Sequence, residues 1–211
     1  MLDTKQSGDA AVADSLMAAE LVSLRRHALQ DGSRNQNPSG MTFWRLARED
    51  FEANGRSMLS QGFWALFWHR FGNWRMSLRP KVLRAPFSVL YRIMHKACQW
   101  FCGIDLPYNV VVGRRVRLEH FGGMVLVAAS IGDDVYIRQN TTFGIKRPNA
   151  TDGWPVIGNR VDIGVGAVVL GAVEIGDDAV IGANCVVPKS VLAGSVVGGV
   201  PARLIRMRDD I

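Results

Sequence analysis

One histidine in the second half of the chain has the surroundings of a proton-transfer group. Residues 103–211 contain only His120, which follows Glu119 and precedes the flexible pair Gly122 and Gly123. An imidazole with an ordinary pKa near 6.5 can accept a proton at neutral pH, so His120 is a candidate general base. A lone histidine is also often structural, and its spacing alone leaves both interpretations open.

The same residues argue against a metal site. A zinc site of the carbonic-anhydrase kind needs three imidazoles, and this half of the chain has one. Cys98 and Cys102 stand four apart in a helical pattern and Cys185 stands alone, so the cysteines have neither metal-ligand spacing nor the pattern of a disulfide framework. We expect no metal cofactor.

A six-residue repeat must position His120. Small or β-branched residues follow most aliphatic positions by four residues, as at Ala167 and Cys185. This period fits neither a helix nor an alternating strand, and it predicts a β-solenoid whose triangular turns each contain three six-residue strands. We expect about four to five turns between Val112 and Gly198, with Cys185 packing inward. The in-phase aliphatic residues are Ile131, Ile137, Phe143, Ile157, Ile163, Val169, Ile175, Ile181 and Val187.

Two breaks interrupt the repeat, and connections that leave a rigid scaffold often carry binding and chemistry. One extra residue lies in HFGGMVLVAAS, so His120 falls in the first break and should point out of the solenoid. The second break is residues 146–155, KRPNATDGWP, a polar segment rich in turn formers that we expect to loop out.

Four regions follow from these patterns. Residues 1–40 are expected to be a flexible or loosely attached amino-terminal segment, because DGSRNQNPSG resembles a linker. Residues 41–102 should form a helical domain with helices over 41–54, 61–76 and 81–101. Residues 103–200 should form the solenoid, and residues 201–211 a carboxyl-terminal tail.

Composition places the chain among ordinary globular proteins. It has 211 residues, of which 48% are hydrophobic and 21% charged, and this excludes disorder and collagen. No apolar run is long enough for a transmembrane helix, and the first residues do not form a secretory signal, so we expect a cytoplasmic protein.

The charge of +6 lies entirely in residues 1–102, and no acidic residue occurs between Glu52 and Asp105. Four tryptophans share this basic stretch. Such a surface suits an anionic lipid headgroup, a nucleic acid or a phosphorylated substrate, whereas the simpler interpretation is a helical cap with solvated charges. Of the macromolecular partners, we expect peripheral membrane contact at the inner face and no nucleic acid.

The string GIDLPYNVVVGRRVRLEHFGG, the repeats and the terminal GGVPARLIR together resemble the serine acetyltransferase branch of the hexapeptide acyltransferases from about residue 41 to residue 206. EDFEANGR and APFSVLYRI look closest to acetyltransferases of exopolysaccharide clusters such as colanic acid. The resemblance implies an α+β fold in which a helical region precedes a left-handed parallel β-helix. It also implies a homotrimer, with a dimer of trimers as an alternative, and acetyl-CoA bound in grooves between neighbouring subunits.

The resemblance also implies roles for individual residues. His120 would be the general base and Asp105, fifteen residues earlier, would orient it, whereas the structural alternative for Asp105 is a turn residue that caps its own backbone. The implied cofactor-binding residues are Gly144, Val165 and Ala183, through their backbones, and Arg203, through its guanidinium.

The acceptor site departs from the family pattern. Serine enzymes have an Arg-His pair that grips the serine carboxylate, and the matching positions here are Gly153 and Trp154. About two charge-assisted hydrogen bonds of roughly 1.5–3 kcal/mol each would be missing. Glu119 replaces the family's aspartate beside the catalytic histidine and is retained as an acceptor-binding residue. Trp154 offers a face for a sugar ring, or it packs the loop onto the solenoid.

These observations lead to three hypotheses. The first is an acetyl-CoA-dependent O-acetyltransferase acting on a sugar hydroxyl of a surface polysaccharide or its precursor, with N-acetylation of an amino sugar left open. The second is serine O-acetylation for cysteine synthesis, which the Gly153 and Trp154 positions count against. The third is a non-catalytic solenoid used as an assembly module, which His120 and Asp105 count against.

Overall fold

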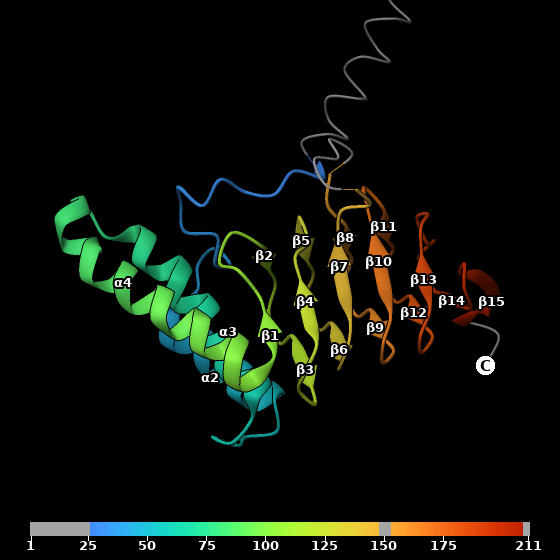
Figure 1. The fold of residues 1–211 in the computed structure, drawn as a ribbon, viewed down its shortest axis with the longest axis horizontal. Helices are drawn as coiled ribbons and strands as arrows, with labels where there is room; N and C mark the ends of the chain where they lie inside the picture. The colour runs from blue at the N-terminus through green and yellow to red at the C-terminus, as the bar shows by residue number, and fades with distance from the viewer. Residues whose placement is uncertain (1–25, 148–152, 209–211) are drawn as a thin grey trace, which may run out of the picture.

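A computed structural model describes residues 26–147 and 153–208. Three helices stand at one end of the molecule and a three-faced parallel solenoid extends away from them (Figure 1). The expected fold class, a helical region followed by a β-helix of hexapeptide repeats, is confirmed.

The helices begin where the sequence supplies side-chain caps. Helix α2 (Phe43–Ala53) begins after Thr42, whose hydroxyl accepts the Arg45 N–H, and α3 (Gln61–Trp74) begins after Ser60, which caps Phe63 in the same way. Helix α4 (Lys81–Ala97) follows the short 3-10 turn η1 (Arg75–Ser77) and runs into the π-helical turn η2 (Cys98–Cys102). The three helices match the ranges expected from the sequence.

The strands form the three faces of the prism, with strands on each face pairing in parallel except at the carboxyl end. Face A contains β1 (Ile104–Asp105), β4 (Met124–Leu126), β7 (Thr142–Gly144), β10 (Val168–Leu170) and β13 (Val186–Val187). Face B contains β2 (Val111–Val112), β5 (Ser130–Ile131), β8 (Val156–Ile157) and β11 (Glu174–Ile175). Face C contains β3 (Arg117–Glu119), β6 (Tyr136–Arg138), β9 (Asp162–Ile163), β12 (Val180–Ile181), β14 (Ser195–Gly198) and the antiparallel β15 (Arg203–Met207).

The repeat positions form the core. Every aliphatic residue of the six-residue series is at most 2% exposed, and Ala167 and Cys185 are completely buried. Stacking the same position in successive turns produces continuous apolar columns, which is why a short repeat suffices to specify the interior. The inward packing of Cys185 is confirmed.

A buried polar cluster joins the helices to the first turn of the solenoid. Asp50 on α2 and Arg70 on α3 are both 0% exposed, and the Arg70 Nε donates to Asp50 Oδ2 at 2.9 Å. The Arg70 guanidinium also donates to the carbonyls of Val112 at 2.7 Å and Gly113 at 2.5 Å. The helical region is therefore fastened to β2 by charge-assisted hydrogen bonds that exclude water.

His69, next to Arg70, is buried as a neutral imidazole. Its Nε2–H donates to the Val110 carbonyl at 3.0 Å, and burial, reinforced by the Arg70 charge, lowers its pKa to about 3. An unfolded His69 would titrate near pH 6.5, so between pH 6.5 and 3 the unfolded chain binds the additional proton. The His69 contribution to the free energy of unfolding is thus complete above pH 6.5 and is lost as the pH falls.

We expect the stability contributed by His69 to decrease by about 2 kcal/mol between pH 7 and pH 5. Urea unfolding of the wild type and His69→Gln at both pH values measures it, because the glutamine amide can still donate to Val110 but does not titrate. The variant should lose less stability than the wild type on acidification. Equal losses would show that His69 is protonated in the folded chain.

The N-terminal strap, residues 26–40, differs from the expectation of a loosely attached segment. It runs beside the helices to the middle of the solenoid (Figure 1), and its residues are hydrogen-bonded along the way. The Asn37 side chain donates to the Arg70 carbonyl at 3.0 Å, and the Asn109 side chain donates to the Gln30 carbonyl at 3.2 Å. Hydrogen bonds between side-chain amides and backbone carbonyls produce no periodic pattern of hydrophobic residues, so the sequence did not predict these contacts. Residues 1–25 lie outside the described residues.

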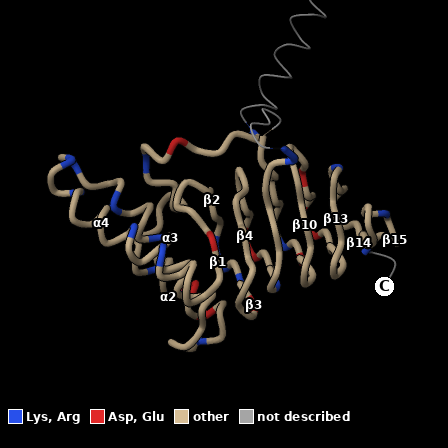
Figure 2. Tube along the Cα trace, in the orientation of Figure 1, with Lys and Arg blue, Asp and Glu red and all other residues tan. Residues whose placement is uncertain are grey.

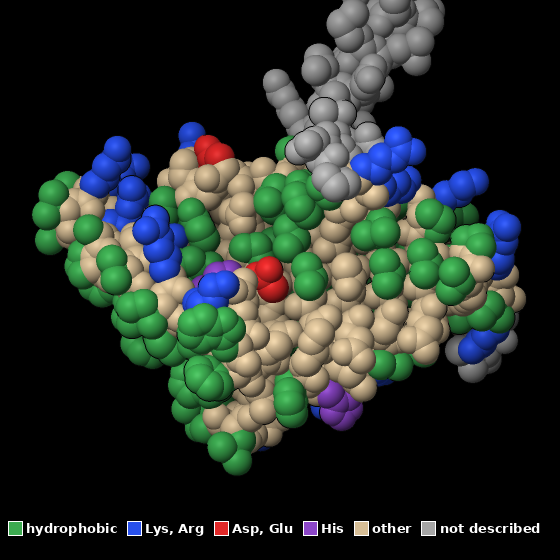
Figure 3. All heavy atoms as spheres, in the orientation of Figure 1, with side chains coloured by type: hydrophobic (Ala, Val, Ile, Leu, Met, Phe, Trp, Pro, Cys, Tyr) green, Lys and Arg blue, Asp and Glu red, His purple; other side chains and the backbone are tan. Residues whose placement is uncertain are grey.

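Helix α4 buries only Tyr91 fully and leaves an apolar face exposed. Figure 2 shows Lys and Arg positions along this helix, and Figure 3 shows apolar side chains gathered over the same end of the molecule. The exposed apolar side chains are Val82, Leu83, Val89, Leu90 and Ile93, followed by Trp100 and Phe101 in η2. No helix within residues 26–147 and 153–208 is long and apolar enough to cross a membrane.

Candidate active site

His120 lies in the turn between β3 and β4, where the extra residue of the first break is accommodated. The residue has a φ of +60°, and Gly122 and Gly123 also have positive φ values. The turn is held by backbone hydrogen bonds from Gly122 N–H to the Cys102 carbonyl and from Asn140 N–H to the Gly122 carbonyl, both 3.1 Å. The side chain is 67% exposed, so its imidazole is available to a substrate.

Glu119 is the carboxylate beside this imidazole. Its Oε2 lies 4.0 Å from His120 Nε2, and its Oε1 accepts from Arg117. A hydrogen bond from the Tyr136 hydroxyl, together with the Arg117 charge, holds the pKa of Glu119 below its usual value. The carboxylate is therefore anionic at neutral pH and can stabilise a protonated imidazole.

Asp105 does not lie against His120 within one chain. It belongs to β1 on face A, opposite Val125, whereas His120 follows β3 on face C. Its Oδ1 accepts from the Gln99 side chain at 2.9 Å and lies 3.3 Å from His95 Nε2. The hydrogen bond from His95, reinforced by Gln99, lowers the pKa of Asp105. In one chain, then, the Asp105 carboxylate contacts His95 of α4 and Gln99 of η2.

The three backbone positions expected to hold the cofactor lie on two edges of face A. Val165 and Ala183 each precede a face A strand by three residues and occupy equivalent corners of successive turns. Gly144 ends β7 opposite Leu170, which ends β10, and so lies at the other edge of the face. The structure thus brings Val165 and Ala183 together and keeps Gly144 apart from them.

Arg203 lies at the start of β15, exposed to solvent and beside a second cation. It lines a cavity of about 400 Å³ together with Lys189, Ser190 and Pro201. Two cations and a hydroxyl around one cavity suit a phosphate group. Lys189 was not predicted from the sequence, although a lysine that follows the last in-phase residue, Val187, was a usable signal.

Trp154 is partly buried, and its backbone is tied to the N-terminal strap. Its N–H donates to the His27 carbonyl at 2.8 Å, and its own carbonyl accepts from the His27 Nδ1 at 2.9 Å. His27 Nε2 in turn lies 3.5 Å from Glu174 Oε1. Gly153, with a φ of +92°, packs so closely on His27 that a Cβ atom would clash. The strap therefore anchors the carboxyl end of the second break. Residues 148–152 of that break lie outside the described residues.

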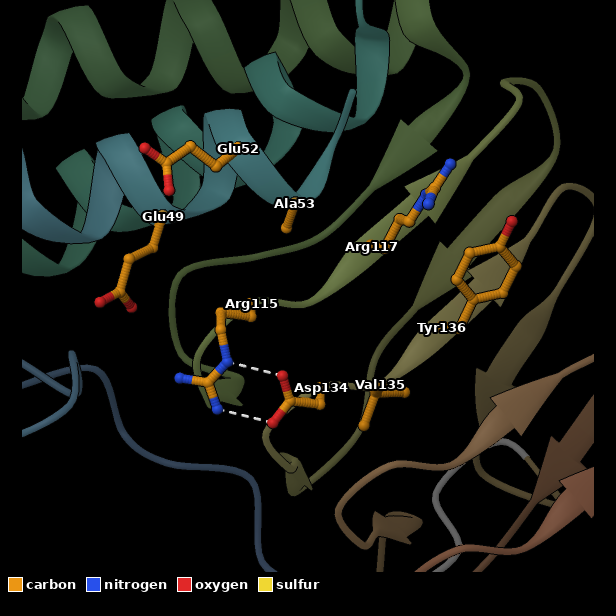
Figure 4. A pocket seen from close by; sticks show the side chains of 8 residues that line it. All are labelled: Glu49, Glu52, Ala53, Arg115, Arg117, Asp134, Val135 and Tyr136. Atoms are coloured by element: carbon orange, nitrogen blue, oxygen red, sulfur yellow. Dashed lines mark hydrogen bonds and ion pairs between the residues drawn. The ribbon is translucent and has the colours of Figure 1, made fainter. Parts of the chain in front are cut away.

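A cleft next to Glu119 was not predicted from the sequence. It lies between α2 and the outer side of β3 and β6, and Figure 4 shows Glu49 and Glu52 on the helix side and Arg115, Arg117 and Tyr136 on the strand side. Arg117 and Glu119 flank the inward Leu118, so alternation along β3 was the signal that both face outward.

No group of three or more potential metal ligands occurs within residues 26–147 and 153–208. The described groups of the site are an exposed imidazole, carboxylates, guanidinium groups and an aromatic hydroxyl. Such a set suits general-base catalysis on a polar acceptor.

Comparisons with known proteins identify the family of the chain. Residues 155–189 match the family described as bacterial transferase hexapeptide (six repeats). The serine acetyltransferase of Mycobacterium tuberculosis is 37% identical over 145 residues, which are 68% of this chain and 60% of that enzyme. The Helicobacter pylori serine acetyltransferase is 32% identical over 165 residues, covering 76% of this chain and 92% of that enzyme. The soybean serine acetyltransferase apoenzyme superposes with a TM-score of 0.64 at 26% identity, covering 96% of this chain and 93% of that one.

These relatives support the serine acetyltransferase part of the expected resemblance and give no support to the exopolysaccharide branch. The Mycobacterium enzyme is longer, and this chain spans 60% of its length. The Helicobacter enzyme, however, is covered almost entirely at 32% identity. The chain belongs to the serine acetyltransferase family of hexapeptide-repeat transferases.

Proposed function

We propose that the chain is an acetyl-CoA-dependent O-acetyltransferase with His120 as its general base. Family membership supports the reaction, and the exposed imidazole beside the Glu119 carboxylate supports the base. The imidazole takes the acceptor's hydroxyl proton while the oxygen attacks the thioester carbonyl. The tetrahedral intermediate collapses, the C–S bond breaks, and the imidazolium returns the proton to the leaving thiolate.

The donor would lie in a groove between two subunits of a homotrimer. A groove of this kind would take Val165 and Ala183 from one edge of face A and Gly144 from the other edge in a neighbouring subunit. Arg203 and Lys189 would bind phosphate groups of the donor, because they line one cavity. Asp105 would orient His120 of a neighbouring subunit, since the two residues do not meet within one chain. A dimer of such trimers is the alternative assembly.

For the acceptor we propose the hydroxyl of L-serine, the alternative that the sequence alone ranked second. The observation that carries it is the identity of 32–37% to two enzymes named serine acetyltransferase. A sugar hydroxyl is the second candidate, favoured by Gly153 and Trp154 in place of the family's carboxylate-gripping pair.

Acetyl-CoA consumption with L-serine, neutral saccharides and no acceptor tests this choice. We expect L-serine to exceed neutral saccharides in kcat/KM by at least about tenfold, the effect of one charge-assisted hydrogen bond. A higher kcat/KM with a neutral saccharide would contradict serine as the acceptor and favour the second candidate.

A further part of the proposal concerns α4. Its apolar face, described above, is flanked by basic side chains with no acidic residue nearby in sequence, which is the charge pattern that suits anionic lipid headgroups. The enzyme would then lie at the inner face of the membrane, on the cytoplasmic side. The flanking basic residues are Arg79, Lys81, Arg84, Arg92 and Lys96.

We expect the protein to sediment with phosphatidylglycerol vesicles at low salt and not with phosphatidylcholine vesicles. Replacing Arg84 and Arg92 with glutamine should weaken sedimentation, because each cation near an anionic surface contributes about 1 kcal/mol. If the protein does not bind phosphatidylglycerol vesicles and its mass in solution is that of six chains, the α4 face would instead be a contact between two trimers.

A further inference from the structure

The cleft between α2 and face C has a volume of about 500 Å³ and is lined in part by Arg117, the residue that contacts Glu119. Its walls carry Glu49, Glu52, Arg115, Arg117, Asp134 and Tyr136. Both signs of charge and an aromatic ring are therefore available to a small polar molecule. The position of the cleft next to Glu119 makes it a candidate for the acceptor's binding site, an inference that rests on the proposed function.

Two of the ion pairs at the cleft are bidentate and already complete. Arg115 donates from Nε and Nη2 to the two oxygens of Asp134, both at 2.6 Å, as the dashed lines in Figure 4 show. Glu49 accepts from the Arg114 Nε at 2.9 Å and Nη2 at 2.7 Å. A ligand that bound these groups would have to break a bidentate pair, at a cost in free energy.

Arg117 is different. A single Nη2 contacts Glu119, and the guanidinium lies 5.2 Å from the centroid of the Tyr136 ring. The side chain is 46% exposed, and its remaining donors can reach a ligand in the cleft without displacing Glu119. A guanidinium presents the planar donor pairs that match a carboxylate.

The position of Arg117 relative to His120 fits a small acceptor. Glu119 contacts Arg117 with Oε1 and lies 4.0 Å from His120 with Oε2, so one carboxylate bridges the cation and the base. A molecule whose carboxylate binds Arg117 can therefore present a hydroxyl a few bonds away toward His120. An ammonium group on the same molecule would meet the anionic Glu119.

We propose that Arg117 binds the carboxylate of the acceptor and that the acceptor is a hydroxyl compound carrying a carboxylate. The Arg117 guanidinium would bind the carboxylate in place of the cationic pair whose positions are occupied here by Gly153 and Trp154. Two sources share this chemistry, a hydroxy amino acid and a sugar acid. The assay separates them.

The test measures KM and kcat with L-serine, L-serinamide, glucuronate and glucose, for the wild type and for Arg117→Met and Arg117→Lys. Arg117→Met should raise the KM for whichever acid is used by about 10- to 100-fold with a smaller change in kcat, and lysine should recover part of the loss. The carboxylate-free partner of that acid, L-serinamide or glucose, should be a poor acceptor for the wild type and should be unaffected by the substitution. Arg160→Met is the matched control, since Arg160 is an exposed arginine paired with Asp178 away from the cleft.

Calorimetric binding of L-serine and glucuronate provides a readout that does not depend on acetyl transfer. Binding that Arg117→Met weakens, without thioester consumption by the wild type, would support the carboxylate site and contradict the proposed reaction. Thioester consumption with equal KM values in the wild type and Arg117→Met, both folded by thermal unfolding, would overturn the role of Arg117 and leave the reaction standing.

Discussion

Replacing Arg70 with methionine is expected to lower the free energy of unfolding by about 3–5 kcal/mol. The substitution removes the partner of Asp50, which is 0% exposed, and leaves a buried carboxylate with nothing to neutralise it. It also deprives the carbonyls of Val112 and Gly113 of their guanidinium donor. The loss should be visible as a lower urea midpoint, because most point substitutions cost far less.

The companion double variant distinguishes an unpaired charge from a packing defect. Asp50→Asn combined with Arg70→Met removes both charges and should recover part of the lost stability. Arg48→Met is the control, since Arg48 forms an exposed pair with Glu52 and should change stability by less than about 1 kcal/mol. A stability of Arg70→Met within 1 kcal/mol of the wild type would contradict the structural role of the Asp50–Arg70 pair.

His120→Ala is expected to lower kcat by roughly 10²- to 10⁴-fold, the usual contribution of a positioned general base. An alcohol is a weak nucleophile toward a thioester until its proton is transferred, and alanine cannot accept that proton. Stability should change little, because the side chain is 67% exposed and its ion-pair approach to Glu119 is as long as 4.0 Å.

A conservative variant separates chemistry from geometry. His120→Asn keeps a polar side chain and tolerates the positive φ at this position, yet it has no group that accepts a proton at neutral pH. Both variants should lose kcat while their KM for acetyl-CoA stays within a few-fold of the wild type. A parallel loss of acetyl-CoA binding would instead assign His120 to holding the donor.

The interior of the solenoid could be predicted almost residue by residue. A six-residue period places the same position on the same face of each turn, so spacing alone predicts that Ile163 and Cys185 lie in the core, and both are buried. The helical ranges 41–54, 61–76 and 81–101 are predicted from residue spacing, and α2, α3 and α4 lie within them. These features are local or periodic, and the sequence carries them directly.

The arrangement of the site was harder to predict because it depends on tertiary contacts without a period. Asp105 and His120 are fifteen residues apart, and a solenoid turn with strands on three faces separates them onto different faces, where His95 from α4 reaches Asp105 instead. His27 likewise contacts Trp154, which is far away in the sequence. Arg117 contacts Glu119, and both side chains lie on the outer side of β3. Charge and spacing showed which groups were present and left their partners undetermined.

In the proposed reaction, His120 transfers the acceptor's proton during acetyl transfer from acetyl-CoA. Release of free coenzyme A thiol by purified wild type and His120→Ala, with and without L-serine at saturating acetyl-CoA, measures it most directly. We expect acceptor-dependent thiol release by the wild type and a rate at least about 100-fold lower for the variant. Equal acceptor-dependent rates for the two proteins would contradict it.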